Sequence, residues 1–222
     1  MNGLKQPVTY LALGDSLTEG IGADGPDRHL VAQVFDYLRK TEQCRVQNWG
    51  ISGLTSRELF ELLQTPALMK LLPRVSHITI TTGGCDFIEW FEEGANLMGL
   101  VKTMRRVRNQ AEKILSLVRK SNPDGDVQML GFYLPIPAYE LGLAMASRAV
   151  QTMNLSYSEL CRKYEVQLVN PFEHFLHRKD YFADDVHPNQ QGYDELARLF
   201  LSTVPEKSPP PEPTPSPQES MA

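Results

Sequence analysis

The chain has 222 residues, of which 41% are hydrophobic and 22% are charged, and its formal net charge is -5 at pH 7. A chain of this size and composition is expected to form one soluble, globular domain around a single core, which argues against fibrous and membrane-embedded classes. The acidic balance and the lack of a basic run argue against nucleic-acid binding, and no apolar stretch reaches the roughly 20 residues that cross a bilayer.

Short apolar runs alternate with amphipathic stretches along the chain. The apolar runs predict β-strands over residues 8–13, 45–49, 77–82, 126–132 and 167–169. The amphipathic stretches predict α-helices over residues 27–41, 56–64, 96–120, 141–164 and 190–202. Strands separated by helices pair in parallel through right-handed crossovers. The expected fold class is therefore α/β, a three-layer α/β/α sandwich with a parallel sheet of about five strands, as in flavodoxin-like proteins.

The longest expected helix carries apolar residues at spacings of three and four. These residues are Leu97, Leu100, Val101, Met104, Val107, Ala111, Ile114, Leu115 and Val118. This spacing predicts one apolar stripe that faces the sheet. The basic residues of the segment lie mostly off the stripe, and we expect them to form a solvated face rather than a patch for anionic lipid.

The C-terminal residues differ from the rest of the chain because Pro, Ser, Glu and Thr dominate them. Such a composition cannot supply a hydrophobic core. We therefore expect a folded domain over residues 1–204 and a Pro-rich disordered tail over residues 205–222.

The N-terminus and the cysteines bear on the cellular compartment. Residues 1–8 lack the basic segment and long apolar core of an export signal. Cys44, Cys85 and Cys161 form no Cys-x-x-Cys pair, which fits a reduced compartment. We therefore expect a cytoplasmic protein.

Two polar motifs point to nucleophilic catalysis. The sequence Gly-Asp-Ser-Leu follows the first expected strand and contains Ser16, whereas Asp-Asp-Val-His-Pro near the end of the domain contains Asp184 and His187. A serine hydroxyl becomes nucleophilic when an imidazole takes its proton and a carboxylate orients that imidazole. Because Asp184 and His187 are three residues apart, one loop can bring both to the strand end that presents Ser16. Asp185 is the competing candidate for the acid.

The chain resembles the GDSL, or SGNH, hydrolases from about Tyr10 to the helix after His187. Three blocks carry the resemblance in the same order: Leu-Gly-Asp-Ser-Leu-Thr, Asn-Trp-Gly-Ile-Ser-Gly-Leu-Thr and Asp-x-x-His-Pro-Asn. It implies that Ser16 is the nucleophile and that Asp184 and His187 are the acid and base of a catalytic triad. It also implies that the backbone N–H of Gly53 is an oxyanion donor.

A further block departs from the family pattern. Relatives usually have Gly-Asn-Asp where this chain has Gly-Cys-Asp, so Cys85 replaces an asparagine whose amide donates to the oxyanion. A thiol is a weak donor, and loss of one strong donor costs roughly a hundred- to a thousandfold in turnover. The expected oxyanion hole therefore combines the N–H groups of Ser16 and Gly53 with a weak third donor, and we expect a slow enzyme. The alternative, that Cys85 is the nucleophile, lacks a second Cys–His motif.

Apolar and aromatic clusters follow the third and fourth expected strands. The candidate substrate-binding residues are Phe87, Trp90, Tyr133 and Ile136, although such clusters also serve as ordinary core packing. Activities in the family include carboxylesterase, lysophospholipase, thioesterase and carbohydrate deacetylase. The apolar character favours a lipid acyl ester, and hence a lipase, phospholipase or lysophospholipase. The chain is also similar to the unexported GDSL lipases of spore-forming bacteria, which raises a spore association as an alternative location.

Other sequence features bear on metal binding, non-catalytic binding and nucleotide binding. His174 and His177 supply two ligands where a zinc site needs three or four, so we expect neither a metal nor a cofactor. A weakly active or non-catalytic binding module remains open because of Cys85. A flavodoxin-like nucleotide-binding protein would fit the alternating elements, but the chain has no Gly-rich phosphate loop. The expected partner is a small-molecule or lipid ester.

Overall fold

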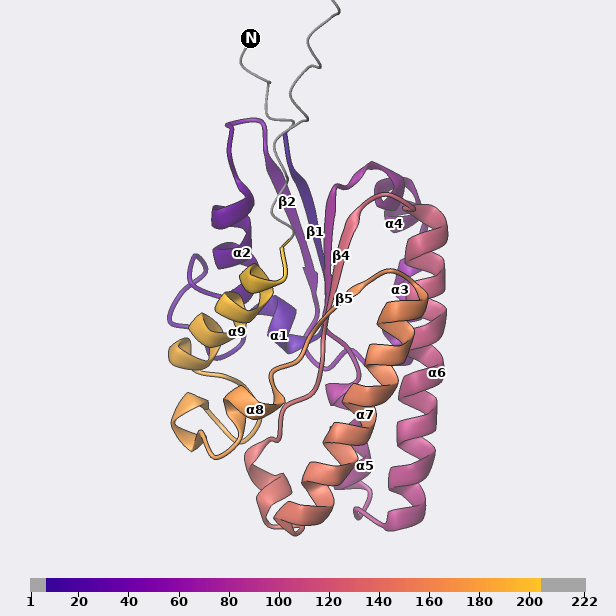
Figure 1. The fold of residues 1–222 in the computed structure, drawn as a ribbon, viewed down its shortest axis with the longest axis vertical. Helices are drawn as coiled ribbons and strands as arrows, with labels where there is room; N and C mark the ends of the chain where they lie inside the picture. The colour runs from indigo at the N-terminus through magenta and orange to yellow at the C-terminus, as the bar shows by residue number, and fades with distance from the viewer. Residues whose placement is uncertain (1–6, 205–222) are drawn as a thin grey trace, which may run out of the picture.

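The computed structural model describes residues 7–204, which form a sheet with helices on both faces (Figure 1). The sheet in this part of the chain has the strand order β2-β1-β3-β4-β5, and every neighbouring pair is parallel. The strands are β1 (Thr9–Gly14), β2 (Arg45–Gly50), β3 (His77–Ile80), β4 (Asp126–Leu130) and β5 (Gln167–Val169). The predicted α/β sandwich with a parallel, five-stranded sheet is confirmed.

Alternate residues of β1 enter two different cores. Leu11 and Leu13 are fully buried against the helices of one layer, whereas Tyr10 and Ala12 are fully buried against the helices of the other. The first layer contains α3 (Ser56–Leu63), α4 (Pro66–Leu71), α6 (Leu97–Ser121) and α7 (Leu143–Lys163). The second layer contains α2 (Leu30–Leu38) and α9 (Gln190–Ser202). Both faces of β1 are therefore buried, as expected for a strand inside a parallel sheet.

Local capping explains where several helices begin. Helix α3 starts with a capping box in which Thr55 and Glu58 satisfy each other's backbone N–H groups. Asn96 and Asn189 cap α6 and α9 by accepting from the N–H groups of Gly99 and Gly192. Each of these three helices begins within a few residues of its predicted start.

The predicted apolar stripe of α6 holds over most of the helix but not over its first turns. Leu100, Val107 and the apolar residues that follow are buried against the sheet. Leu97 and Val101 are exposed instead, so the prediction that they face the sheet is wrong. The start of α6 extends past the end of the sheet, where no strand lies beneath it (Figure 1).

Two expected strands end earlier than predicted, and short helices, α4 among them, form where no helix was predicted. β3 ends at Ile80 and β4 at Leu130, so the residues that follow belong to the loops at the carboxyl edge of the sheet. Helix α5 (Gly84–Glu92) begins within one of these loops. None of the helices among residues 7–204 is long and apolar enough to span a membrane. The predicted tail, residues 205–222, lies outside the described residues.

Candidate active site

Ser16 is the first residue of α1 (Ser16–Glu19), which begins immediately after β1. The turn between them is tight: a side chain on Gly14 would place its Cβ atom 2.1 Å from the Thr81 hydroxyl. Asp15 caps α1 through a hydrogen bond from the N–H of Leu17. A strand that ends in glycine and continues into a short capped helix therefore presents Ser16 at the carboxyl edge of the sheet, where ligands bind in open α/β folds.

The three predicted triad residues form a hydrogen-bonded chain. The Nε2 atom of His187 lies 2.9 Å from Ser16 Oγ, and its Nδ1 atom lies 2.7 Å from Asp184 Oδ2. A carboxylate at Nδ1 holds the proton there, which leaves Nε2 free to accept the serine proton. This is the geometry that makes a serine hydroxyl nucleophilic.

Asp184 is held in place by its own loop. Its Oδ1 atom accepts from the N–H groups of Val186 and His187, at 2.8 and 2.7 Å. Burial raises the pKa of Asp184, but the two N–H groups and the imidazole outweigh it, so the pKa lies below its ordinary value and the carboxylate stays ionised. Among the described residues, it is Asp184 and not Asp185 that pairs with the imidazole, while the backbone carbonyl of Asp185 accepts from the N–H of Ile136.

Two buried carboxylates, Asp15 and Asp86, accept hydrogen bonds from backbone N–H groups and from neighbouring side chains. Asp15 is buried and accepts from the Thr81 hydroxyl at 2.7 Å, and burial raises its pKa although these hydrogen bonds oppose the shift. Asp86 is buried and accepts from the N–H and hydroxyl of Ser56 and from Arg106. Both carboxylates tie loops together at the edge of the sheet.

Cys85 lies in the first turn of α5, buried beside the backbone of Gly53. Burial, with the negative charges of Asp15 and Asp86, raises the pKa of the Cys85 thiol to about 12, although a hydrogen bond from the Gly53 backbone opposes the shift. The thiol is therefore protonated and neutral at physiological pH. Gly53 itself has a φ of 81° in the loop after β2, a conformation that favours glycine. The structure thus brings these two predicted oxyanion-hole residues together.

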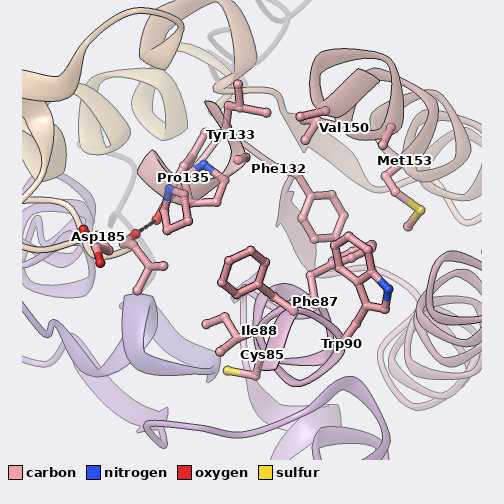
Figure 2. Close-up of a pocket in the computed structure, with 18 of the residues that line it drawn as sticks. Cys85, Phe87, Ile88, Trp90, Phe132, Tyr133, Pro135, Val150, Met153 and Asp185 are labelled. Carbon is pink, nitrogen blue, oxygen red and sulfur yellow. Dashed lines mark hydrogen bonds between the residues drawn. The ribbon is translucent and has the colours of Figure 1, made fainter. Parts of the chain in front are cut away.

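A cavity of about 400 Å³ opens beside Ser16. Figure 2 shows side chains of α5, of the segment after β4 and of α7 surrounding this space. Ser16, Cys85 and His187 line it together. Its other lining residues are mostly apolar and include Leu17, Phe87, Ile88, Trp90, Phe91, Leu100, Phe132, Tyr133, Leu134, Pro135, Pro137, Leu141, Met145, Val150 and Met153. The arrangement places the Ser16 hydroxyl and the His187 imidazole at one side of a largely apolar space.

Three of the four predicted substrate-binding residues line the cavity: Phe87, Trp90 and Tyr133. Ile136 does not line it. Ile136 begins a 3-10 turn, Ile136–Tyr139, and its neighbours Pro135 and Pro137 line the cavity in its place. The hydroxyl of Tyr133 donates to the carbonyl of Val186 at 2.8 Å, so the aromatic wall is tied to the loop that carries His187.

One wall of the cavity was not predicted from the sequence. Met145, Val150 and Met153 lie on α7 and line the space together with neighbouring alanines. Their helical spacing gives the only sequence signal, and that signal also fits packing against the sheet. The N-terminal half of α7 runs beyond the carboxyl edge of the sheet, so its inner face meets the cavity (Figure 1).

Comparisons with known proteins agree with this architecture. The model of the GDSL-like lipase/acylhydrolase family matches residues 12–195. Over 213 residues the chain is 25% identical to the uncharacterized protein YpmR of Bacillus subtilis, a match that spans 90% of this chain and 82% of that protein. It is 27% identical over 204 residues to the spore germination lipase LipC of Bacillus licheniformis, across 86% of this chain and 93% of that one.

A solved structure has the same fold over nearly the whole domain. The lipase Lip_vut3 from a goat rumen metagenome superposes with a TM-score of 0.77 at 23% identity, covering 88% of this chain and 96% of that one. The family match includes the blocks around Ser16 and His187. The chain belongs to the GDSL-like lipase/acylhydrolase family.

Proposed function

We propose that the protein is a serine hydrolase of lipid acyl esters, with Ser16 as the nucleophile and the acyl chain lying in the apolar cavity. One observation carries the proposal: the hydrogen-bonded chain of Ser16, His187 and Asp184 opens onto a largely apolar space of about 400 Å³. Membership of a family of lipases and acylhydrolases supports ester hydrolysis as the reaction.

The first half of the reaction forms an acyl-enzyme. Nε2 of His187 takes the proton of Ser16 as Oγ attacks the ester carbonyl carbon, and Asp184 stabilises the imidazolium that results. The backbone N–H groups of Ser16 and Gly53 donate to the oxyanion, with the protonated thiol of Cys85 as a weak third donor. His187 then gives its proton to the departing alkoxide, the bond from the carbonyl carbon to that oxygen breaks, and the acyl group remains on Ser16.

The second half releases the acid. His187 takes a proton from water, the hydroxide attacks the acyl carbon, and the proton returns to Ser16 as the acyl–serine bond breaks. The enzyme is regenerated with no cofactor, and the products are an alcohol and a carboxylic acid.

The lining of the cavity favours a fatty acyl group over an acetylated sugar. Phe87, Trp90, Phe132 and Met153 offer hydrocarbon and aromatic surface, against which each buried CH₂ contributes about 0.8 kcal/mol. Sugar hydroxyls need hydrogen-bonding partners, which Phe87, Phe132 and Met153 do not provide, and the Nε1 donor of Trp90 is already bonded to the carbonyl of Asn96. The likeness to a protein named a spore germination lipase supports a lipid substrate and a spore association as parts of the same proposal.

Hydrolysis of a series of p-nitrophenyl esters, from acetyl to palmitoyl, tests the proposal. We expect kcat/KM to rise with chain length until the cavity is filled, because each added CH₂ finds apolar surface. A maximum at acetyl with a fall for every longer ester would indicate a deacetylase. No turnover of any ester by folded protein would indicate a non-catalytic binding module.

A further inference from the structure

Exposed apolar side chains lie at the mouth of the cavity and beside it, on α5, the start of α6 and the start of α7. These helix segments lie at one end of the molecule (Figure 1). Leu97 and Met98, in the first turn of α6, are 68% and 67% exposed. Together with exposed neighbours on the three helices they form a surface that we call the apolar collar. Its members are Ile88, Phe91, Leu97, Met98, Val101 and Met145.

The collar is continuous with the cavity. Ile88, Phe91 and Met145 are exposed and also line the cavity, so each forms part of its mouth. The start of α6 is joined to this mouth through Trp90, a cavity residue whose Nε1 donates to the carbonyl of Asn96 at 2.9 Å. A single apolar surface therefore runs from solvent across the mouth to the space beside the reactive serine.

The position of these residues distinguishes them from ordinary exposed hydrophobics. Single apolar side chains on a surface are normal, but a group around the mouth of a ligand cavity marks an interaction site. Leu97 and Met98 add little to the core, because both side chains are mostly exposed. The start of α6 also extends past the end of the sheet (Figure 1). The cavity that they adjoin takes hydrocarbon, and a lipid layer presents hydrocarbon in bulk.

The charges around the collar indicate which lipid headgroups the collar would favour. Glu89 and Glu92 lie on α5 and Glu93 caps its C-terminus, while α6 carries the basic residue Arg106 close to Glu89. Arg106 is paired with Asp86 at 3.2 Å and with Glu89 at 3.6 Å. Because charges of both signs lie beside the collar, they do not favour anionic headgroups. The apolar area must then supply the attraction, which suits neutral or zwitterionic lipid.

We propose that the apolar collar docks on the surface of neutral or zwitterionic lipid, so that the mouth of the cavity opens directly onto the lipid layer. An acyl ester then reaches Ser16 without crossing water. That last step rests on the proposed function, whereas docking requires no hydrolysis and is measured separately.

Flotation of full-length Ser16→Ala protein with phosphatidylcholine vesicles measures docking without turnover. In that background Leu97→Ser should lower the partition coefficient about fivefold and Leu97→Ser/Met98→Ser at least about tenfold, because less apolar area enters the lipid. Leu155→Ser is the matched control, since Leu155 is also 68% exposed but lies on α7 outside the collar and the cavity. It should bind like the parent. With Ser16 intact, all three variants should hydrolyse a monomeric short ester at the wild-type rate.

Three results would overturn docking on neutral lipid. The first is no binding to phosphatidylcholine, and the second is equal loss in Leu155→Ser and Leu97→Ser. The third is binding only to vesicles of anionic phosphatidylglycerol that disappears in high salt, which would indicate the basic face of α6. A dimer in sedimentation that Leu97→Ser/Met98→Ser dissociates, without vesicle binding, would assign the collar to a second copy of the chain. Vesicle binding through the collar by a protein inactive on every ester would uphold docking and overturn the proposed function.

Discussion

The Nε2 atom of His187 lies 2.9 Å from the Oγ atom of Ser16, although the two residues are 171 positions apart in the chain. Hydrogen bonds beside this contact join the two segments. The hydroxyl of Tyr193, on α9, donates to the carbonyl of Ile21 at 2.8 Å, and the side chain of Gln190 accepts from the N–H of Asp24 at 3.1 Å. The site therefore forms only when α9 has packed beside the turn after α1, and folding and site assembly are coupled.

Asp184 and Asp185 offer a paired test of the acid. Asp184→Asn should lower kcat/KM by about a hundredfold or more, because an amide no longer stabilises the imidazolium or fixes its tautomer. Asp185→Asn should stay within about threefold of wild type, since the backbone bond to Ile136 persists. Steady-state hydrolysis of one p-nitrophenyl ester by both variants gives the comparison. The opposite ranking would reassign the triad.

Replacing Cys85 by asparagine should speed the enzyme. The amide is a stronger donor than the thiol, so Cys85→Asn should raise kcat by about ten- to a hundredfold with a smaller change in KM. Cys85→Ala is the control, and it should be no faster than wild type. Pre-steady-state release of p-nitrophenol locates the gain in acylation. An unchanged or lower kcat in Cys85→Asn would mean that residue 85 is not an oxyanion donor.

The protonation state of Cys85 can be tested through its reactivity. Its pKa is raised from 9.0 to about 12, and a thiol becomes nucleophilic only as the thiolate forms above its pKa. At about pH 8 the thiolate fraction is then about a thousandfold lower than for an ordinary thiol, and it rises about tenfold with each pH unit. Mass spectrometry of iodoacetamide-treated protein should show slow alkylation of Cys85 that accelerates in this way. Rapid, pH-independent alkylation near neutrality would revive Cys85 as a nucleophile.

Sequence patterns were sufficient to predict the sheet and to bring Ser16, His187 and Asp184 together. The five apolar runs became the five parallel strands, because each is short and flanked by turn residues or amphipathic helices. The motifs around Ser16 and His187 gave the hydrogen-bonded chain, since the carboxyl ends of parallel strands meet at one edge.

The walls of the cavity were harder to predict because they depend on where helices end relative to the sheet. Helix α5 has no side-chain cap, because its N-cap residue is Gly83, with a φ of 98°, so its start carries no local signal. The turn that begins at Ile136 moves that side chain out of the lining. Leu97 fits the stripe of α6 by spacing alone, but the sheet ends before it. For Leu97, tertiary position overrode a correct local pattern.

The wall formed by α7 should set the acyl length. Ala149 lines the cavity, and Ala149→Phe adds a ring to that space. We expect its optimum in the p-nitrophenyl ester series to move to shorter chains, with kcat/KM for the longest wild-type substrate lowered about tenfold by overpacking. Ala144→Phe is the control, because Ala144 is exposed on the same helix and does not line the cavity. An unchanged profile in Ala149→Phe would place the acyl chain elsewhere.

Labelling with a p-nitrophenyl alkylphosphonate tests the central claim most directly, because phosphonates form stable adducts with activated serines. Peptide mass analysis should find one adduct, on Ser16, formed at least about a thousandfold faster in wild type than in His187→Ala. Ser16→Ala should remain unlabelled and should not hydrolyse esters. An adduct on Cys85 or any other residue, or undiminished ester hydrolysis by Ser16→Ala, would contradict Ser16 as the nucleophile.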